Sequence, residues 1–270
     1  MASRPALEAA GTVAGMSAAG DQRGVLSVVV PCFNEQETIS EIVDAVLASE
    51  VVGEVIVVDD GSTDGSAKIL AELALDDPRV RVLTNEVNRG KGASLRRGFA
   101  EARLPFVVVQ DADLEYNPTD YPRLIGPLLA GKADVVFGSR FQGAAEHRVL
   151  FFWHSLGNKF LTLLSNACTN LNLTDMETGY KAFRLDVLQR VELEESRFGV
   201  EPEITAKVAR LHCRVYEVGI SYHGRTYAEG KKIGWRDGLH AVFCILAYSA
   251  AGERLGLKRL RPAVARLTGG

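Results

Sequence analysis

Two aspartates separated by one residue, Asp111 and Asp113, follow the apolar run 106–109 and Gln110. A short apolar run is typical of a buried strand, so both carboxylates are predicted at the carboxyl end of a strand. An open α/β sheet forms its ligand crevice there. Carboxylate oxygens are preferred ligands of Mg²⁺ and Mn²⁺, which readily share their coordination shell with phosphate oxygens. The spacing therefore predicts a site for a divalent cation and a phosphorylated ligand.

Strands and helices alternate along the chain from residue 25 onward. Apolar runs predict strands at 25–30, 54–58, 80–83, 106–109 and 134–137, and helical spacing predicts intervening helices at 36–49, around 69–73 and at 91–102. Strands that are apolar on both faces and separated by helices specify a mostly parallel sheet covered on both sides. The predicted fold class is therefore α/β, with a doubly wound, mostly parallel sheet.

Polar clusters follow the first four predicted strands, at residues 31–35, 59–64, 88–92 and 111–113. Because parallel strands end at one edge of a sheet, these clusters are expected to converge. A carboxylate in the first or second cluster can accept hydrogen bonds from a nucleobase or a ribose. Gly90 and Gly92 allow backbone N–H groups to approach a diphosphate, and Lys91 adds a positive charge. Taken singly, each cluster also fits a turn or a helix cap.

The sequence contains neither Gly-x-Gly-x-x-Gly nor Gly-x-x-x-x-Gly-Lys-Ser/Thr. This absence argues against a dinucleotide-dependent oxidoreductase and against a P-loop ATPase. A nucleotide diphosphate bound through a metal without either motif indicates group transfer from an activated donor. The cation would neutralise the charge that develops on the departing diphosphate.

The ordered motifs Val-Val-Val-Pro-x-x-Asn-Glu, Val-Val-Asp-Asp-Gly-Ser-Thr-Asp, Asn-Arg-Gly-Lys-Gly and Asp-Ala-Asp resemble those of the family 2 glycosyltransferases. The resemblance covers about residues 25–235 and implies the GT-A nucleotide-sugar-binding fold. It also implies an inverting transfer from a nucleotide-diphosphate sugar, with Mg²⁺ or Mn²⁺ as cofactor. The predicted nucleotide-sugar-binding residues are Pro31, Asn34, Glu35, Asp59, Asp60, Lys91, Asp111, Arg225 and Lys231. The predicted metal ligands are Asp111, Asp113 and Glu115.

Within this family, the later segments are most similar to the dolichyl- and polyprenyl-phosphate sugar synthases. The similar segments are Gly138-Ser139-Arg140, Ser155-Leu156-Gly157-Asn158, Asp175–Lys181 and Arg225–Lys231. The resemblance implies that Arg140, with Arg148 and Ser155, binds the phosphate of a polyprenyl or dolichyl phosphate acceptor. It also implies that Arg225 and Lys231 lie on a loop over the diphosphate. The sequence departs from the pattern where Glu115 replaces Gln, where Lys181 replaces Arg, and where Trp153-His154 replaces a basic stretch.

The chemistry of the acceptor leaves alternatives open. A phosphate monoester is already anionic and needs only positioning and charge balance, whereas a hydroxyl acceptor needs a general base. Glu201 and Glu203 are the candidate bases, although acidic residues also favour a helix amino terminus. The predicted catalytic residues are thus Asp113, Arg140 and Glu201. The alternatives are a transferase that acts on a hydroxyl of a glycan or small molecule and a non-catalytic nucleotide-sugar sensor. A processive polymerase is disfavoured because Gln-x-x-Arg-Trp and a transmembrane bundle are missing from the sequence.

Charge and composition suggest three parts: a disordered leader at 1–24, a catalytic domain at 25–232 and a basic, amphipathic helical extension at 233–270. Residues 1–206 carry 19 Lys and Arg against 30 Asp and Glu, and residues 207–270 carry 12 against 4. This asymmetry favours a local anionic partner, such as a lipid surface, over nucleic acid. Residues 150–171 and 233–266 are candidates for peripheral membrane contact. The first segment also fits an aromatic-rich helix that packs on its own sheet, and the basic charge of the C-terminal region also fits a solvated tail. With widely spaced cysteines and no convincing transmembrane segment, the prediction is a cytoplasmic protein, peripheral at the cytoplasmic face of a membrane.

Overall fold

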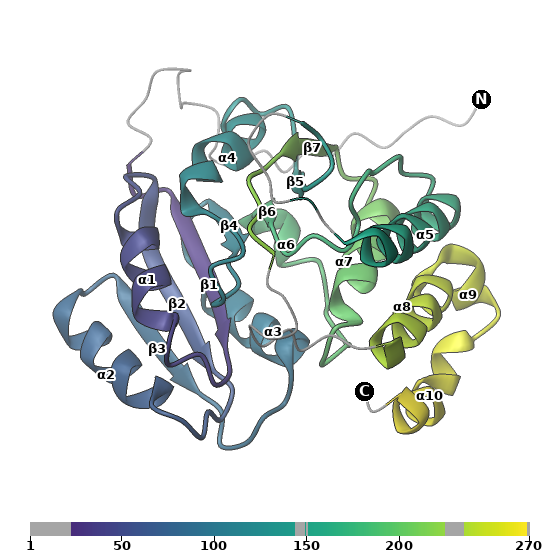
Figure 1. The fold of residues 1–270 in the computed structure, drawn as a ribbon. Coiled ribbons are helices and arrows are strands. Elements are labelled where there is room, and N and C mark those ends of the chain that lie inside the picture. Colours follow the sequence, from purple (N-terminus) through teal and green to yellow (C-terminus); the bar gives the residue numbers. More distant parts are fainter. Residues whose placement is uncertain (1–22, 144–148, 150, 225–234, 269–270) are drawn as a thin grey trace.

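The computed structural model describes residues 23–143, 149, 151–224 and 235–268 (Figure 1). The strands are β1 (Leu26–Cys32), β2 (Val52–Asp59), β3 (Val80–Thr84), β4 (Phe106–Val109), β5 (Val135–Ser139), β6 (Lys181–Arg184) and β7 (Val215–Gly219). The helices before β7 are α1 (Ile39–Leu47), α2 (Ser66–Asp76), α3 (Lys91–Glu101), the 3₁₀ helix η1 (Pro118–Asp120), α4 (Tyr121–Leu129), α5 (Phe152–Thr169), α6 (Leu185–Leu188) and α7 (Val200–Arg210). After β7 come α8 (Trp235–Tyr248), α9 (Ala250–Arg254), the 3₁₀ helix η3 (Leu257–Leu260) and α10 (Arg261–Thr268).

The strands form one seven-stranded sheet in the order β3-β2-β1-β4-β6-β5-β7. Strand β1 pairs in parallel with β2 and β4, and β5 pairs in parallel with β7. Strand β6 runs antiparallel between β4 and β5. The predicted α/β class and mostly parallel sheet are confirmed. Strands β6 and β7 were not among the predicted strands. The four residues of β6 include two charged ones, and Glu217 interrupts the apolar residues of β7, so neither forms an apolar run.

Helices cover both faces of the sheet, as the doubly wound pattern predicts. Side chains alternate along β1, so Val28 and Val30 pack on one face with Ile42 of α1, and Val29 packs on the other with Leu95 of α3. All five side chains are almost completely buried. Full burial of one such side chain contributes about 1.5–3 kcal/mol. The apolar strands therefore form the rigid layer from which the polar loops project.

The C-terminal helices pack onto the α/β body, where α8 contacts both α5 and α7 (Figure 1). Lys258 Nζ lies 3.0 Å from Glu194 Oε1 and 2.9 Å from Glu253 Oε1. Arg261 Nε lies 2.8 Å from Glu195 Oε1. Part of the basic charge of the C-terminal region is thus balanced by acidic residues of the same chain. The predicted boundaries at 24 and 232 fall beside or within residues outside the described part of the chain, and they stay predictions.

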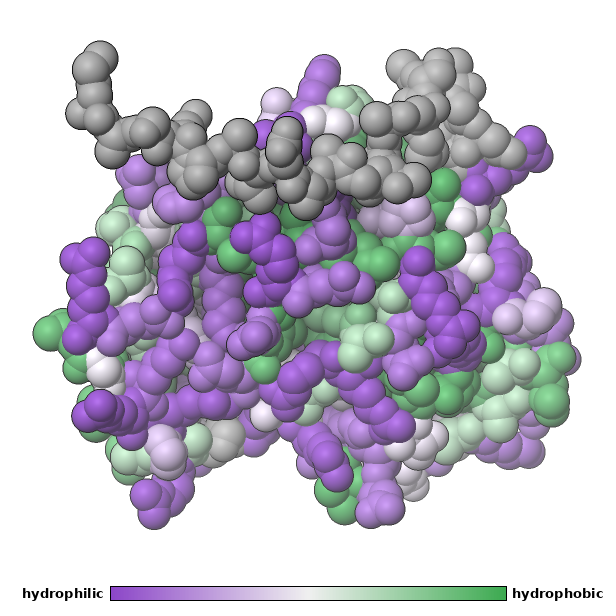
Figure 2. Space-filling model, turned by 180° about the vertical axis from the view of Figure 1, so that it is seen from behind, coloured by the Kyte–Doolittle hydropathy of each residue, from purple (hydrophilic) through white to green (hydrophobic). Residues whose placement is uncertain are grey.

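Seen from behind, the surface is largely hydrophilic, with apolar side chains confined to smaller areas (Figure 2). Over the described ranges, none of the helices combines the length and apolar character needed to cross a membrane. All four cysteines are free thiols, and Cys32 and Cys244 are buried.

Candidate active site

The first and second polar loops interlock beyond the carboxyl ends of β1 and β2. The N–H of Asn34 donates to Ser62 Oγ at 3.0 Å, and Asn34 Oδ1 accepts from the Thr63 N–H at 2.8 Å. Asn34 has a φ of 53°, a left-handed conformation that asparagine tolerates better than most residues. Its amide therefore shapes the loop pair in this structure. Pro31 is half-buried at the end of β1 beside it.

The two aspartates that end β2 also organise loops. Asp59 Oδ1 accepts from the Ser62 N–H at 3.0 Å. The buried carboxylate of Asp60 accepts from the N–H groups of Arg89 and Gly90, at 3.0 Å and 2.6 Å, and from Asn85 Nδ2 at 2.7 Å. Asp60 thereby fixes the third polar loop, where Gly90 needs its φ of 93°. Its predicted contact with a nucleoside stays a prediction.

The start of α1 is tied to the Asp-Ala-Asp loop. Thr38 Oγ1 donates to the backbone carbonyl of Ala112 at 2.7 Å and lies 3.1 Å from Glu35 Oε2. The structure thus places Glu35 next to the loop that carries Asp111 and Asp113. Four polar loops that are far apart in sequence meet at one edge of the sheet, as the strand order requires.

Lys91, the first residue of α3, lies between two carboxylates. Its Nζ is 2.7 Å from Asp111 Oδ1 and 3.0 Å from Glu201 Oε1. Burial alone lowers the pKa of Lys91, but Asp111 and Glu201 outweigh this effect and hold its pKa well above the usual value. A fixed ammonium in this place suits a ligand that carries concentrated negative charge, such as a diphosphate.

The Asp-Ala-Asp loop makes a tight turn. Asp113 Oδ1 accepts from the Glu115 N–H at 3.2 Å, and Leu114 between them has a φ of 61°. A non-glycine residue in this region costs about 1–3 kcal/mol and often marks a functional segment. The Glu115 carboxylate is oriented by Tyr222, whose hydroxyl donates to Oε2 at 2.8 Å.

The donor set of Asp111, Asp113 and Glu115 fits a hard divalent cation, because all three supply carboxylate oxygens. Within the described part of the chain, their ligand atoms do not gather within 4.8 Å of one another, as those of Glu195, His240 and Cys244 do. Lys91 contacts Asp111, and Tyr222 contacts Glu115. The metal assignment therefore stays a prediction.

Arg140, at the end of β5, forms a two-pronged ion pair with Asp175. Its Nε lies 2.6 Å from Oδ2 and its Nη2 lies 2.7 Å from Oδ1. Burial opposes ionisation of Asp175, but Arg140 and Asn158 outweigh it and keep the pKa of this carboxyl below its usual value. The sequence pattern placed Asp175 in a family-like motif without assigning it a role. Only the fold brings the two residues together, 35 positions apart.

An aromatic wall connects the Asp111 and Arg140 regions. The Tyr116 hydroxyl accepts the Gly179 N–H at 2.8 Å, and a Cβ on Gly179 would collide with Asp111 Oδ2. The Tyr116 ring lies 5.3 Å from the Tyr222 ring, and the Arg140 guanidinium lies 5.1 Å from the Tyr222 centroid. The predicted donor side at Asp111 and the predicted acceptor side at Arg140 therefore lie at the two ends of the aromatic wall that Tyr116 and Tyr222 form.

Three buried oxygens beside this region have no hydrogen-bond partner in the described structure: Glu177 Oε1, Thr178 Oγ1 and Glu201 Oε2. A buried polar atom without a partner costs about 1–3 kcal/mol, so such atoms are commonly satisfied by a ligand or water. No role was predicted for Glu177 or Thr178 from the sequence. Their place in the segment Asp175–Lys181, which resembles the family's motif, was the feature that could have indicated one.

Glu177 is expected to make stability depend on pH. Burial raises the pKa of its carboxyl from 4.5 to about 8. The folded state thus keeps this proton between about pH 4.5 and pH 8, where the unfolded state releases it, so the free energy of unfolding falls as the pH rises. Burial lowers the pKa of the nearby Lys181 from 10.5 to about 8, so its titration affects stability only above about pH 8.

Glu177→Gln is therefore expected to flatten the loss of stability between pH 5 and pH 8, by on the order of a few kcal/mol. Urea unfolding at several pH values measures this change. Glu37→Gln, on an exposed loop, is the control that should follow the wild type. If the free energy of unfolding depends on pH in the same way for wild type and Glu177→Gln, the raised pKa of Glu177 is contradicted.

The remaining predicted residues are placed as follows. Glu201 lies in the first turn of α7 and pairs with Lys91. Glu203 is completely buried, accepts from the N–H groups of Glu194 and Glu195, and contacts Lys207, so it supports the fold. Ser155 lies in the first turn of α5, with its N–H donating to the Phe151 carbonyl. Arg148, Arg225 and Lys231 lie outside the described residues.

A family model described as glycosyl transferase family 2 matches residues 27–192. The match includes β1 except its first residue, β2 to β6 and all four polar loops. The chain belongs to glycosyl transferase family 2. Its predicted membership and its assignment as a glycosyltransferase are thereby confirmed.

This family 2 glycosyltransferase is 31% identical to the undecaprenyl-phosphate mannosyltransferase of Micrococcus luteus, over 85% of this chain and 96% of that protein. It is 30% identical to the polyprenol monophosphomannose synthase of Mycolicibacterium smegmatis, over 77% of this chain and 80% of that protein. Glucosyl-3-phosphoglycerate synthase of Mycobacterium tuberculosis, solved with Mn²⁺ and UDP-glucose, has a TM-score of 0.64 at 24% identity. The match covers 84% of this chain and 79% of that chain. This last comparison supports the predicted GT-A fold.

Proposed function

We propose that this family 2 glycosyltransferase moves a hexose from a nucleotide-diphosphate sugar to a polyprenyl phosphate, with a divalent cation at the Asp-Ala-Asp loop. The observation that carries the proposal is the aromatic wall through Tyr116 and Tyr222, which connects Lys91 and Asp111 with Arg140. A transfer reaction requires donor and acceptor sites to be adjacent, whereas a nucleotide-sugar sensor requires only the first.

The names of the relatives support the acceptor. Two relatives at 30–31% identity, covered over most of their length, are named for undecaprenyl phosphate and polyprenol. A phosphate acceptor needs no general base, and a planar guanidinium suits it. Arg140 is held in one orientation by Asp175. It would direct the acceptor phosphate toward the sugar carbon, opposite the departing diphosphate.

The donor side is supported by the charge of the site. Lys91 would bind the diphosphate, and Asp111 and Asp113 would hold Mg²⁺ or Mn²⁺. The bound cation would balance negative charge on the leaving diphosphate. The unpartnered oxygens of Glu177 and Glu201 are suited to accept hydrogen bonds from sugar hydroxyls. The neighbouring fold solved with Mn²⁺ and UDP-glucose is consistent with this arrangement.

A transfer assay tests the proposal directly. Purified protein is incubated with a short polyprenyl phosphate, with Mg²⁺ or Mn²⁺, and in parallel with radiolabelled GDP-mannose or UDP-glucose. We expect label in the organic phase with one donor, and loss of that label when the metal is chelated. Donor binding without labelled lipid would contradict the acceptor assignment.

A second candidate is transfer to a hydroxyl of a glycan or small molecule, with Glu201 as general base. The observation that favours it is the buried, unpartnered Oε2 of Glu201. Glu201→Gln separates the two candidates. A hydroxyl acceptor predicts a loss in kcat of about 10²–10⁴-fold with a matching change in the pH profile. A phosphate acceptor predicts a smaller loss in kcat, which would arise only because Glu201 contacts Lys91.

Helix α5 supports peripheral membrane contact, because it turns apolar side chains outward. Phe152, Trp153 and Leu163 are 69%, 76% and 69% exposed, whereas Thr162 and Ser165 face the interior. This is the reverse of an ordinary surface helix. An acceptor lipid lies in a membrane, and aromatic and aliphatic side chains on one helical face suit the interfacial region of a bilayer.

Replacing Phe152 and Trp153 with Glu is expected to abolish flotation of the protein with vesicles that contain polyprenyl phosphate. The free energy of unfolding should change little, because both side chains are exposed. Leu75→Glu is the matched control, since Leu75 is 87% exposed on α2. Equal flotation of wild type, double variant and control would contradict membrane contact through α5.

A further inference from the structure

The segment 194–197, between α6 and α7, lies between Lys91 and the C-terminal helices. The N–H of Ala93 donates to the Ser196 carbonyl at 3.1 Å. A Cβ on Gly90 would collide with the Ser196 carbonyl oxygen, and one on Gly92 would collide with that of Glu195. The two glycines that flank Lys91 thus allow the loop to pack directly on this backbone.

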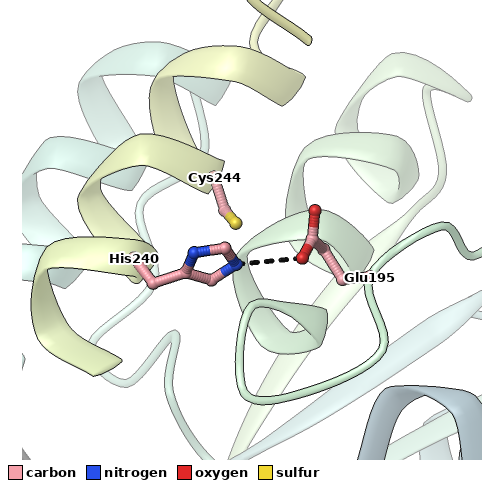
Figure 3. Close-up of side chains that lie close together, drawn as sticks. All are labelled: Glu195, His240 and Cys244. Carbon is pink, nitrogen blue, oxygen red and sulfur yellow. Dashed lines mark hydrogen bonds and ion pairs between the residues drawn. The ribbon is translucent and has the colours of Figure 1, made fainter. Parts of the chain in front are cut away.

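The side chain of Glu195 points the other way, into α8 and α10. Its Oε2 lies 3.0 Å from His240 Nε2 (Figure 3). Its Oε1 accepts from the Tyr248 hydroxyl at 2.9 Å and lies 2.8 Å from Arg261 Nε. The side chain is only 4% exposed. One buried carboxylate therefore joins three residues of the C-terminal helices to the segment that contacts the Lys91 loop.

The same carboxylate forms a compact group with His240 and Cys244, one helical turn apart on α8, and the three ligand atoms lie within 4.8 Å of one another (Figure 3). Burial opposes ionisation of Glu195, but His240 and Arg261 outweigh it and lower the pKa of this carboxyl. Burial also raises the pKa of the Cys244 thiol far above its usual range. Both carboxylate oxygens already have donors and a guanidinium balances the charge, so the group acts as an anchor.

A second carboxylate fixes the segment from α7. Glu203 accepts from the N–H groups of Glu194 and Glu195, at 2.7 Å and 2.8 Å. Helix α7 also carries Glu201, which contacts Lys91 at 3.0 Å. The position of Lys91 is therefore set by Glu201 on one side and by the backbone of 195–196 on the other.

We propose that Glu195 is a positioning residue, through which the C-terminal helices hold the Lys91 loop in its donor-binding position. Lys91 itself touches the ligand, and Glu195 acts only through the 195–196 backbone. The inference rests on the proposed function in one respect, namely that Lys91 binds the donor diphosphate. It assigns the C-terminal helices a role in donor affinity.

Glu195→Gln in the full chain tests this role, because the amide keeps the shape of the side chain and removes the charge that pairs with Arg261. The rate of amide hydrogen exchange at residues 89–94 measures how firmly the Lys91 loop is held, and it requires no assumption about the substrate. We expect exchange there to become about tenfold faster, and the donor KM to rise about tenfold, because weakening hydrogen bonds to a charged group loosens the segment that supports the loop. The kcat should change much less than the donor KM.

Glu253→Gln is the matched control. Glu253 contacts Arg210 and Lys258, so it also anchors the C-terminal helices, but neither of these two contacts involves Glu195. It should leave both exchange at 89–94 and donor KM unchanged. Tyr248→Phe removes a single hydrogen bond to Glu195 and should give a smaller change in the same direction. Tyr248→Phe replaces Glu195→Gln as the test if Glu195→Gln folds poorly.

The outcomes separate this inference from the proposed function. Unchanged exchange at 89–94 in both variants would overturn the positioning role, as would faster exchange of equal size throughout β1 and β4. Faster local exchange with unchanged donor KM would support the mechanical connection and overturn its importance for the donor. If no nucleotide sugar binds to the wild type, the proposed function fails, whereas the exchange result still decides the connection.

Discussion

Asp113→Ala is expected to lower kcat for sugar transfer by about 10²–10³-fold, the usual cost of removing one group that stabilises developing charge. The structure places this carboxylate in the turn after β4, where it accepts a backbone hydrogen bond from Glu115. The side chain is partly exposed in a loop outside the apolar core, so Tm should fall by no more than about 4 °C. The loss of activity should therefore reflect the site and not the fold.

The measurement is a metal titration of the transfer rate, with wild type and variant compared by Tm. Asp44→Asn, which removes an exposed carboxylate from α1, is the control that should retain full activity. Glu115→Gln tests the third predicted metal ligand, because it removes the charge from a side chain that Tyr222 orients. Near-normal turnover of Asp113→Ala at limiting Mn²⁺ would remove Asp113 from the metal site.

Arg140→Ala is expected to destabilise the fold as well as impair the acceptor site. Asp175 is completely buried, and the substitution leaves its charge without the guanidinium. Breaking one side of a buried ion pair costs about 3–5 kcal/mol. From the sequence, Arg140 was predicted as a catalytic residue and a ligand of the acceptor phosphate, and its structural role was not foreseen.

A double variant separates these two roles. Arg140→Met with Asp175→Asn removes both charges, which often leaves stability nearly unchanged. We expect it to regain most of the lost unfolding free energy, to bind the donor normally, and to remain about 10–100-fold lower in kcat/KM for polyprenyl phosphate.

The control pair is Arg184→Met with Asp186→Asn, a more exposed ion pair of 2.7 Å at the other end of β6. It should change the unfolding free energy by no more than about 1 kcal/mol and leave the kinetics unaltered. Wild-type kcat/KM in the Arg140 and Asp175 double variant would exclude Arg140 from the acceptor site.

The charge asymmetry of the chain has a partly internal explanation. The sequence suggested an external anionic partner for the basic C-terminal region. Lys258 and Arg261 instead contact Glu194, Glu195 and Glu253. Charge counts along a sequence record which charges are present, whereas their partners depend on how the helices pack. The exposed apolar side chains of α5 are therefore a stronger structural argument for membrane contact than the basic charge of the C-terminal region.

The sequence alone determined the strands β1 to β5, the helices between the first four of them, and the position of each polar loop at a strand end. These features follow from local patterns, because apolar runs specify buried strands and a period of about 3.6 specifies helices. The order of the motifs also sufficed to identify the family, which the match over residues 27–192 confirmed. Parallel pairing then required Asn34, Asp60, Lys91 and Asp111 to lie at one edge.

Which side chains contact one another depends on the tertiary structure. The antiparallel insertion of β6 brings the 175–179 loop to the site, so that Asp175 contacts Arg140 and Gly179 packs on Asp111. The contacts of Glu195 with His240, Tyr248 and Arg261 cross 45 or more positions of sequence. Such pairs leave no local periodicity, because their energy comes from desolvation and geometry that exist only after the helices and sheet have packed together.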